Sequence, residues 1–272
     1  MGGVRVAVVG HVEWVEFARV ERVPEAGAIV HAEECWAEAA GGGAVAAAEL
    51  ARLAGGVSLF TALGNDELGR SAREQLEAAG VTVHARPPAE PQRRAVCFVD
   101  AAGERTITVL GDKLRPRGGD ETLPWEELRR ADAAYFVSGD ADALRHARTA
   151  RVLVATAREL PTLRAGGVQL DALVGSAEDD GERYHPGDLE PPPQLVVSTS
   201  GALGGWAQPG GPYRAAALPG ELEDSYGAGD CFAAGLAFAL AEGRPSAEAV
   251  AFAAERAAAA LTRRGAGVAP RP

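Results

Sequence analysis

The chain has 272 residues, of which 47% are hydrophobic and 24% are charged, a balance typical of a globular protein that buries a sizeable core. Its 27 basic residues comprise 26 arginines and a single lysine, Lys113. Lys113 matches neither a P-loop nor the V-A-I-K strand of protein kinases, which excludes both ways of holding phosphates with a lysine. The net charge of -11 argues against nucleic-acid binding, which depends on basic residues.

Cysteine, histidine and hydropathy patterns exclude further classes. Cys35, Cys97 and Cys231 are far apart and odd in number, so we expect free thiols in a reducing cytoplasm. The five histidines show no zinc-binding spacing. The first apolar run is too short for a signal peptide, and no run reaches the roughly 18 residues of a membrane span. We therefore expect a cytoplasmic protein with neither a membrane nor a nucleic acid as partner.

Short β-branched runs alternate with alanine-rich amphipathic stretches along the chain. This alternation is typical of an α/β fold with a mostly parallel sheet and helices on both faces. In chain order, we expect strands over 4–9, 57–62, 133–138, 152–155, 172–174 and 195–199. We expect helices over 44–54, 66–79, 230–241 and 246–263.

Two segments, about 11–40 and 93–110, interrupt this alternation with strand-like but more charged sequence. Within the second, 95–99 and 105–109 flank a polar turn and are typical of a hairpin. We expect both segments to form a small sheet that projects from the main one. The exposed edges and apolar face of such a sheet favour a homodimer through it. No linker divides the chain, so we expect one domain over 1–272.

The segment with the clearest chemistry is 224–235, DSYGAGDCFAAG. Gly227, Ala228 and Gly229, here called the glycine cradle, directly precede an expected helix, whose first N–H groups are unpaired and attract anions such as a transferring phosphoryl group. Asp230 is expected to stay ionised there and to accept a proton from a substrate hydroxyl. Considered alone, Asp230 also fits an ordinary N-cap, and Gly-Ala-Gly an ordinary tight turn.

This segment matches D-[ST]-x-G-A-G-D-x-F-x-x-G at every fixed position, and through it the chain resembles the ribokinase-like, or PfkB, family of sugar kinases. The resemblance implies a three-layer α/β/α sandwich with a small β-sheet lid. It also implies ATP-dependent phosphorylation of a hydroxyl on a sugar, a sugar-like alcohol or a nucleoside. Asp230 would be the catalytic base and the glycine cradle the anion hole. Asp224, which opens the motif, is expected to order the loop through N–H contacts.

Other segments extend the resemblance over nearly the whole chain. Segments 63–69 and 103–106 resemble the family's G-x-D-x-x-G turn and its lid hairpin, and 197–204 resembles its T-x-G-x-x-G nucleotide segment, which implicates Thr199 and Gly201. Segment 173–178 resembles an N-x-x-E segment that organises magnesium and phosphate through water; Glu178 is kept, but Gly175 replaces Asn. The implied cofactors are ATP and Mg²⁺, with a monovalent cation as a further candidate.

The substrate end departs from the family pattern. Relatives carry an Asp shortly after the first strand, and the equivalent position is Val15, with Glu13 and Glu16 nearby. Either acid can accept hydrogen bonds from sugar hydroxyls, although both also fit solvated charges of the lid. Ala46 replaces an Asn that relatives pack against the sugar. The glycines that precede it are kept, as Gly41, Gly42 and Gly43.

We therefore expect a substrate other than ribose, with Arg105 and Arg158 available to bind a phosphate or carboxylate on it. Two alternatives remain open. The replaced residues would suit a non-catalytic sugar- or nucleotide-binding regulatory protein on the same fold. The run 41–44 resembles part of a dinucleotide-binding turn, but residues 36–40 before it fit a strand poorly and alanine stands at position 46 in place of the third glycine. Asp230 and the complete glycine cradle favour the kinase.

Overall fold

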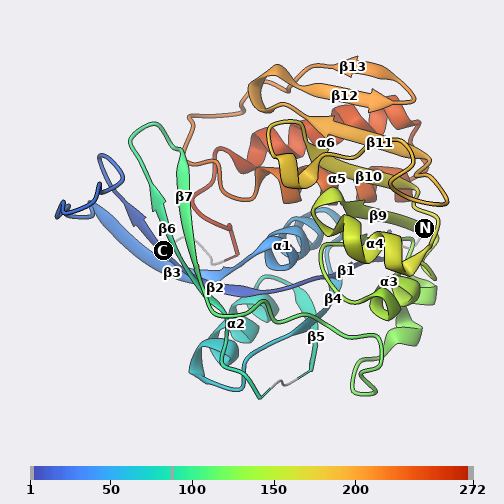
Figure 1. Cartoon of the computed structure of the whole chain (residues 1–272), viewed down its shortest axis with the longest axis horizontal. Helices are drawn as coiled ribbons and strands as arrows, with labels where there is room; N and C mark the ends of the chain where they lie inside the picture. Colours follow the sequence, from blue (N-terminus) through green and yellow to red (C-terminus); the bar gives the residue numbers. More distant parts are fainter. Residues whose placement is uncertain (1–2, 87–88, 269–272) are drawn as a thin grey trace.

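The computed structural model describes residues 3–86 and 89–268, which form two sheets (Figure 1). In this part of the chain the larger sheet has nine strands, in the order β13-β12-β11-β10-β9-β8-β1-β4-β5. They are β1 (Val6–Val9), β4 (Val57–Ala62), β5 (Val81–Arg86), β8 (Ala133–Phe136), β9 (Val152–Thr156), β10 (Ala172–Ser176), β11 (Leu195–Thr199), β12 (Gly205–Gln208) and β13 (Gly211–Tyr213).

The larger sheet is parallel from β5 to β11, and only β12 and β13 at one edge run antiparallel. Its central strands are apolar on both faces, because helices cover both; every residue of β1 and β8 is buried. The six expected strands are therefore present. The sequence analysis did not identify β5, β12 or β13 as strands.

The helices form layers on both sides of this sheet. One face carries α1 (Gly42–Ala54), α2 (Glu67–Ala78), α5 (Ala228–Ala241) and α6 (Ser246–Ala260). The other carries α3 (Ala141–Ala147) and α4 (Leu160–Gly166). Short 3₁₀ turns lie at Trp125–Arg130, Ala157–Glu159, Asp180–Glu182 and Gly201–Leu203. The three-layer α/β/α sandwich is thus confirmed, although α6 ends three residues earlier than expected.

The smaller sheet is the expected lid. Its strand order is β3-β2-β6-β7, with β2 (Glu13–Arg19), β3 (Glu34–Ala40), β6 (Arg94–Val99) and β7 (Arg105–Leu110). The hairpin expected in the second lid segment is β6 and β7, while β2 pairs in parallel with β6. The lid projects beyond the main sheet in Figure 1. Its root is buried through Val15 and Cys97, whereas every residue of β7 is exposed.

The strand order reverses direction at β1, which pairs with β4 on one side and with β8 on the other. In open parallel sheets, ligands bind outside the carboxyl ends of the strands at such a point. The segments that follow β1, β8, β9, β10 and β11 all reach this edge, beneath the lid. No helix in the described ranges has the length and apolar character needed to cross a bilayer.

Candidate active site

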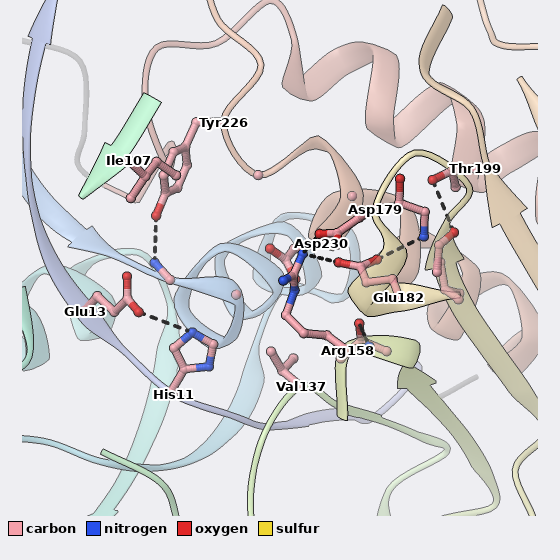
Figure 2. A pocket seen from close by; sticks show the side chains of 18 of the residues that line it. His11, Glu13, Ile107, Val137, Arg158, Asp179, Glu182, Thr199, Tyr226 and Asp230 are labelled. Carbon is pink, nitrogen blue, oxygen red and sulfur yellow. Dashed lines mark hydrogen bonds and ion pairs between the residues drawn. The ribbon is translucent and has the colours of Figure 1, made fainter. Parts of the chain in front are cut away.

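A cavity of about 610 Å³ lies at this edge, between the lid, the start of α5 and the loops after β8 to β11. Figure 2 shows His11 and Glu13 on one side of it and Asp230, Arg158 and Glu182 on the other. The cavity brings together most of the residues singled out from the sequence. These are Glu13, Gly41, Gly42, Arg105, Arg158, Glu178, Thr199, Gly201, Gly227, Gly229 and Asp230.

The glycine cradle forms the start of α5. Gly227 has φ of 74°, a left-handed conformation that favours glycine, and a Cβ on it would lie 2.7 Å from Val45 Cγ1. No side chain caps this helix, so its first N–H groups remain available to a ligand. Ala228 is the first residue of α5 and is not among the cavity-lining residues. A Cβ on Gly229 would meet nothing within 4 Å, so open space lies in front of the cradle.

Asp230 stands in the first turn of α5 and projects toward the cavity. Its Oδ1 accepts a hydrogen bond of 3.4 Å from the hydroxyl of Tyr135 on β8. Burial, with the negative charge of Glu182 adding to it, raises the pKa of Asp230 to about 6. The position in the first turn of a helix favours the ionised form and predicts a weak base; instead, burial makes Asp230 a stronger base than an ordinary aspartate. A Cβ on Gly42 would lie 2.8 Å from Asp230 Oδ1, so Gly42 leaves the carboxylate accessible.

Arg158 and the acids beyond β10 form an ion-pair cluster on the same side of the cavity. The Arg158 guanidinium pairs with Asp179 Oδ2 at 2.7 Å and with Glu182 Oε1. Glu182 Oε2 also accepts a hydrogen bond of 2.9 Å from the N–H of Ser176. A Cβ on Gly175 would lie 2.5 Å from the Glu182 carbonyl oxygen. This contact explains why an asparagine is missing at Gly175, because the segment carrying Glu182 occupies the space of a side chain.

The carboxylates of this cluster are oxygen donors of the kind that Mg²⁺ prefers. Within the described ranges, no group of three or more acids, histidines or cysteines could enclose a metal. Mg²⁺ commonly keeps several waters and binds through one or two carboxylates together with substrate phosphates. Glu178 lines the cavity, and its Oε1 would lie 3.7 Å from a Cβ on Gly201. These donors therefore fit a metal held jointly with water and a phosphate chain.

Thr199 ends β11 at the border of this cluster. Its hydroxyl donates to the Gly175 carbonyl oxygen at 3.3 Å, which joins the ends of β10 and β11 (Figure 2). Gly201 follows with φ of 49° in a short turn, closed by a hydrogen bond of 2.7 Å from the Ser200 N–H to the Gly204 carbonyl oxygen. Both Thr199 and Gly201 line the cavity, so the edge of the sheet offers an open shelf beside the start of α5.

The lid side of the cavity contains Glu13, which is 7% exposed. Its Oε1 lies 3.3 Å from Arg93 Nη1 and 3.6 Å from His11 Nε2. Burial raises the pKa of Glu13. The N–H of Gly41 donates to the Tyr226 hydroxyl at 3.1 Å, and Gly41 has φ of 82°. Glu13, the first residue of β2, thus lines the cavity as a buried carboxylate with a cation and a histidine beside it.

Besides Ala228, three predicted site residues do not line the cavity. Glu16 is on the opposite face of β2, where it pairs with Arg94, and it does not line the cavity. Gly43 packs behind the cavity wall, where a Cβ would lie 2.5 Å from the His11 carbonyl oxygen. Asp224 is fully buried and accepts from the N–H groups of Tyr226 and Gly265, at 2.8 and 2.6 Å. Asp224 thus orders the loop before α5, and it is not among the residues that line the cavity.

Arg105, at the start of β7, lines the cavity and donates to the Ser225 carbonyl oxygen at 2.8 Å, which connects the lid to the loop before α5. The cavity also contains polar residues that the sequence analysis did not assign to it. They are His11, Arg93, Lys113, Tyr135, Thr156, Ser176, Asp179, Glu182 and Tyr226. None of these residues occupies a fixed position of the family motifs. The one feature of the sequence that could have drawn attention to any of them is that Lys113 is the only lysine.

The chain combines a glycine cradle at a helix start, an adjacent carboxylate and a lid over the carboxyl edge of a parallel sheet. This arrangement fits a phosphotransferase of the ribokinase-like fold. The sequence profile described as pfkB family carbohydrate kinase matches residues 4–152 and 169–272. The chain therefore belongs to the pfkB family of carbohydrate kinases. The prediction of an ATP-dependent carbohydrate kinase is confirmed at the level of this family.

Relatives agree with this assignment. An ATP-dependent ribose-1-phosphate kinase of Halopiger xanaduensis is 29% identical over 249 residues, which cover 86% of this chain and 83% of the relative. A putative ribokinase from Agrobacterium tumefaciens superposes with a TM-score of 0.81 at 24% identity, over 99% of this chain and 95% of that one. Ribokinase of Arabidopsis thaliana, solved with ribose and ATP, gives a TM-score of 0.72 at 21% identity, over 99% and 96%.

Proposed function

We propose that the chain transfers the γ-phosphoryl group of ATP to a hydroxyl of a sugar or sugar-like alcohol, as a single ribokinase-like domain over 1–272. The observation that carries this proposal is the position of Asp230. Its carboxylate lies at the cavity, one residue beyond the unpaired N–H groups of the glycine cradle. A base beside an anion-binding helix start is what in-line transfer to a hydroxyl needs.

Each residue of the site has a separate role in the proposed reaction. Asp230 accepts the proton of the acceptor hydroxyl, and Tyr135 holds the carboxylate through its hydrogen bond. The N–H groups of the glycine cradle stabilise the negative charge on the transferring group. The shelf at Thr199 and Gly201 receives the nucleotide, with Glu178 oriented toward its phosphates through water. Mg²⁺, bound with the nucleotide, would neutralise phosphate charge. A monovalent cation stays a prediction.

A specific observation supports the alternative of a non-catalytic sugar- or nucleotide-binding protein. Gly175 and Ala46 both replace asparagines of the family pattern, and neither position can supply a side-chain hydrogen bond. The retained Asp230 and glycine cradle weigh against this alternative, since a binding protein has no need of a base at the reaction centre.

The test is a coupled assay of ADP release with ribose, ribose 1-phosphate and nucleosides as acceptors, run on wild type and Asp230→Asn. We expect Asp230→Asn to lower kcat by about 10³-fold, because a positioned general base contributes roughly 10² to 10⁴. Asp142→Asn, an exposed acid on α3, is the matched control. Equal activity of wild type and Asp230→Asn would refute the catalytic assignment. Absence of turnover with retained ATP binding would establish the binding protein instead.

A homodimer through the lid remains part of the proposal. The two edge strands β3 and β7 have no further strand beside them within the described part of the lid. Among the apolar side chains of β7, Leu110 is 42% exposed outside the cavity, and Ile107 and Val109, which also line the cavity, are 40% and 43% exposed. Unpaired edges and exposed apolar residues are typical of surfaces that associate.

A further inference from the structure

Cations gather at the lid side of the cavity, although the chain as a whole carries a net charge of -11. Arg93 precedes β6, and Lys113 follows β7. Both line the cavity, and their side chains are only 13% and 21% exposed. Partly buried cations are costly unless an anion compensates them. The carboxylates that already pair with Arg93 and Lys113 therefore determine whether this side of the cavity can bind a further anion.

The anions on the protein do not saturate these cations. Arg93 has one ion pair, 3.3 Å from Nη1 to Glu13 Oε1, but within the described residues Arg93 Nε and Nη1 are buried without a hydrogen-bond partner. Glu159 is shared by two cations: its Oε1 is 3.4 Å from Lys113 Nζ, and its Oε2 is 3.5 Å from Arg115 Nη1. Arg115 and Glu159 do not line the cavity, so among the lining residues here the two cations Arg93 and Lys113 face one carboxylate, that of Glu13.

His11 does not alter this balance. Burial, together with the positive charges of Lys113 and Arg93, holds the pKa of His11 well below its ordinary value, so the ring is neutral at physiological pH. Its Nδ1 is buried and has no hydrogen-bond partner among the described residues. The lid side of the cavity therefore combines a net positive charge with unused polar atoms, which is the complement of an anionic ligand.

The arginines that the sequence favoured for this role are already occupied. Arg158 is paired with both Asp179 and Glu182. Arg105 donates to the Ser225 carbonyl oxygen and to the Ser225 hydroxyl. Arg93 has a planar guanidinium with free donors, and Lys113 adds a second charge from a different element. Two cations that converge from separate elements suit a doubly charged, tetrahedral group better than a carboxylate.

We propose that Arg93 and Lys113 bind a phosphate group carried by the acceptor, so that the substrate of this kinase is a sugar phosphate with its reacting hydroxyl at Asp230. This inference rests on the proposed kinase function, and it assigns the specificity for the acceptor to two residues outside the family motifs. Glu13, next to Arg93, is then free to accept hydrogen bonds from sugar hydroxyls near that phosphate.

The test compares each acceptor with its phosphorylated form, such as ribose with ribose 1-phosphate, in wild type, Arg93→Gln and Lys113→Met. We expect wild type to prefer the phosphorylated form. Arg93→Gln should lower its kcat/KM by about 10- to 100-fold, as expected for lost hydrogen bonds to a charged group, and Lys113→Met by about 10-fold. The KM for ATP should stay within about twofold. Arg94→Gln, at the next residue but outside the cavity, is the matched control and should match wild type.

A binding measurement separates this proposal from the kinase function. Inorganic phosphate should raise the Tm of wild type and of Arg94→Gln clearly more than that of Arg93→Gln, which keeps only the glycine cradle as an anion site, while ATP should raise the Tm of all three. The same result without any ADP release would leave the phosphate site standing and refute the kinase. A wild type that prefers the unphosphorylated or a carboxylate-bearing sugar overturns the phosphate site, and so does an equal loss with both acceptor forms in Arg93→Gln and Lys113→Met.

Discussion

The two ends of the cavity present different chemical groups to a ligand. At the start of α5, the ligand-facing groups are backbone N–H donors and glycines, supplied by the contiguous segment 227–230. At the lid side they are polar and charged side chains, supplied by the loop after β1, the start of β2, the residue before β6 and the loop after β7. In the proposed reaction, the first end would bind the transferring phosphoryl group, which all such kinases share, and the second end would bind the acceptor, which differs among them.

Only one of the two ends is therefore recognisable from a short sequence motif. An anion site made of backbone N–H groups needs small residues at fixed spacing, so it appears in the sequence as one short motif. A site made of long side chains can be assembled from distant elements in many ways, and no spacing marks it. Substitutions at the two ends should therefore act differently, on the rate of transfer at α5 and on the choice of acceptor at the lid.

The largest effect after the loss of the base is expected for Gly229→Ala. A methyl group there would enter the open space before the cradle, and lost stabilisation of this kind costs roughly 100-fold in kcat. Because alanine is the better helix former, the Tm should stay equal or rise. Gly119→Ala, also with open space around the added atom, is the control. Full activity of Gly229→Ala would show that no phosphoryl group passes this point.

A smaller effect is expected at the lid side from Glu13→Gln. Removing the charge weakens hydrogen bonds to acceptor hydroxyls, so KM for the acceptor should rise by about 10-fold with little change in kcat. Glu16→Gln changes the same residue type on the outer face of β2 and should remain within about twofold of wild type. Steady-state kinetics on both variants measures these KM values. An equal rise of KM in Glu13→Gln and Glu16→Gln would contradict the assignment of Glu13 alone to the acceptor.

The smallest effect is expected for Tyr135→Phe, which removes the donor to Asp230 Oδ1. A carboxylate that loses a donor is harder to ionise, so its pKa should rise above about 6. Since transfer needs the ionised form, activity falls as pH decreases through this pKa. We expect kcat to drop by about threefold at pH 6 and to change little at pH 8. Tyr213→Phe, whose hydroxyl has no hydrogen-bond partner within the described residues, should leave the pH profile unchanged.

The fold was largely predictable because its long elements carry strong patterns. The buried strands of the larger sheet and the alanine-rich helices were recognised, whereas α3 and α4, with seven residues each, were not. The start of α1 was placed at residue 44, yet its first turn contains Gly42 and Gly43. Helix propensity disfavours glycine there, and the reason for it is tertiary, because side chains would collide with Asp230 and with His11.

The candidate site was predictable at the α5 end of the cavity and much less so at the lid side. Asp230 and the glycine cradle were found from one segment, and the structure places Asp230 at the cavity. Glu13 and Glu16 were indistinguishable until the pairing of β2 with β3 and β6 determined which face points inward. Glu182 could not be found, because its approach depends on the missing side chain at Gly175. Arg93 and Lys113 meet only after the lid has formed.

The position of Lys113 also gives the protein an unusual chemical handle. It is the only lysine in the chain, and it lies in the cavity. Burial lowers the pKa of Lys113, which increases the fraction of unprotonated, nucleophilic amine near neutral pH. Amine-reactive dyes and acylating agents thus have a single lysine to modify. The native chain therefore carries a built-in attachment point for a fluorescent reporter of cavity occupancy, with no engineered cysteine required.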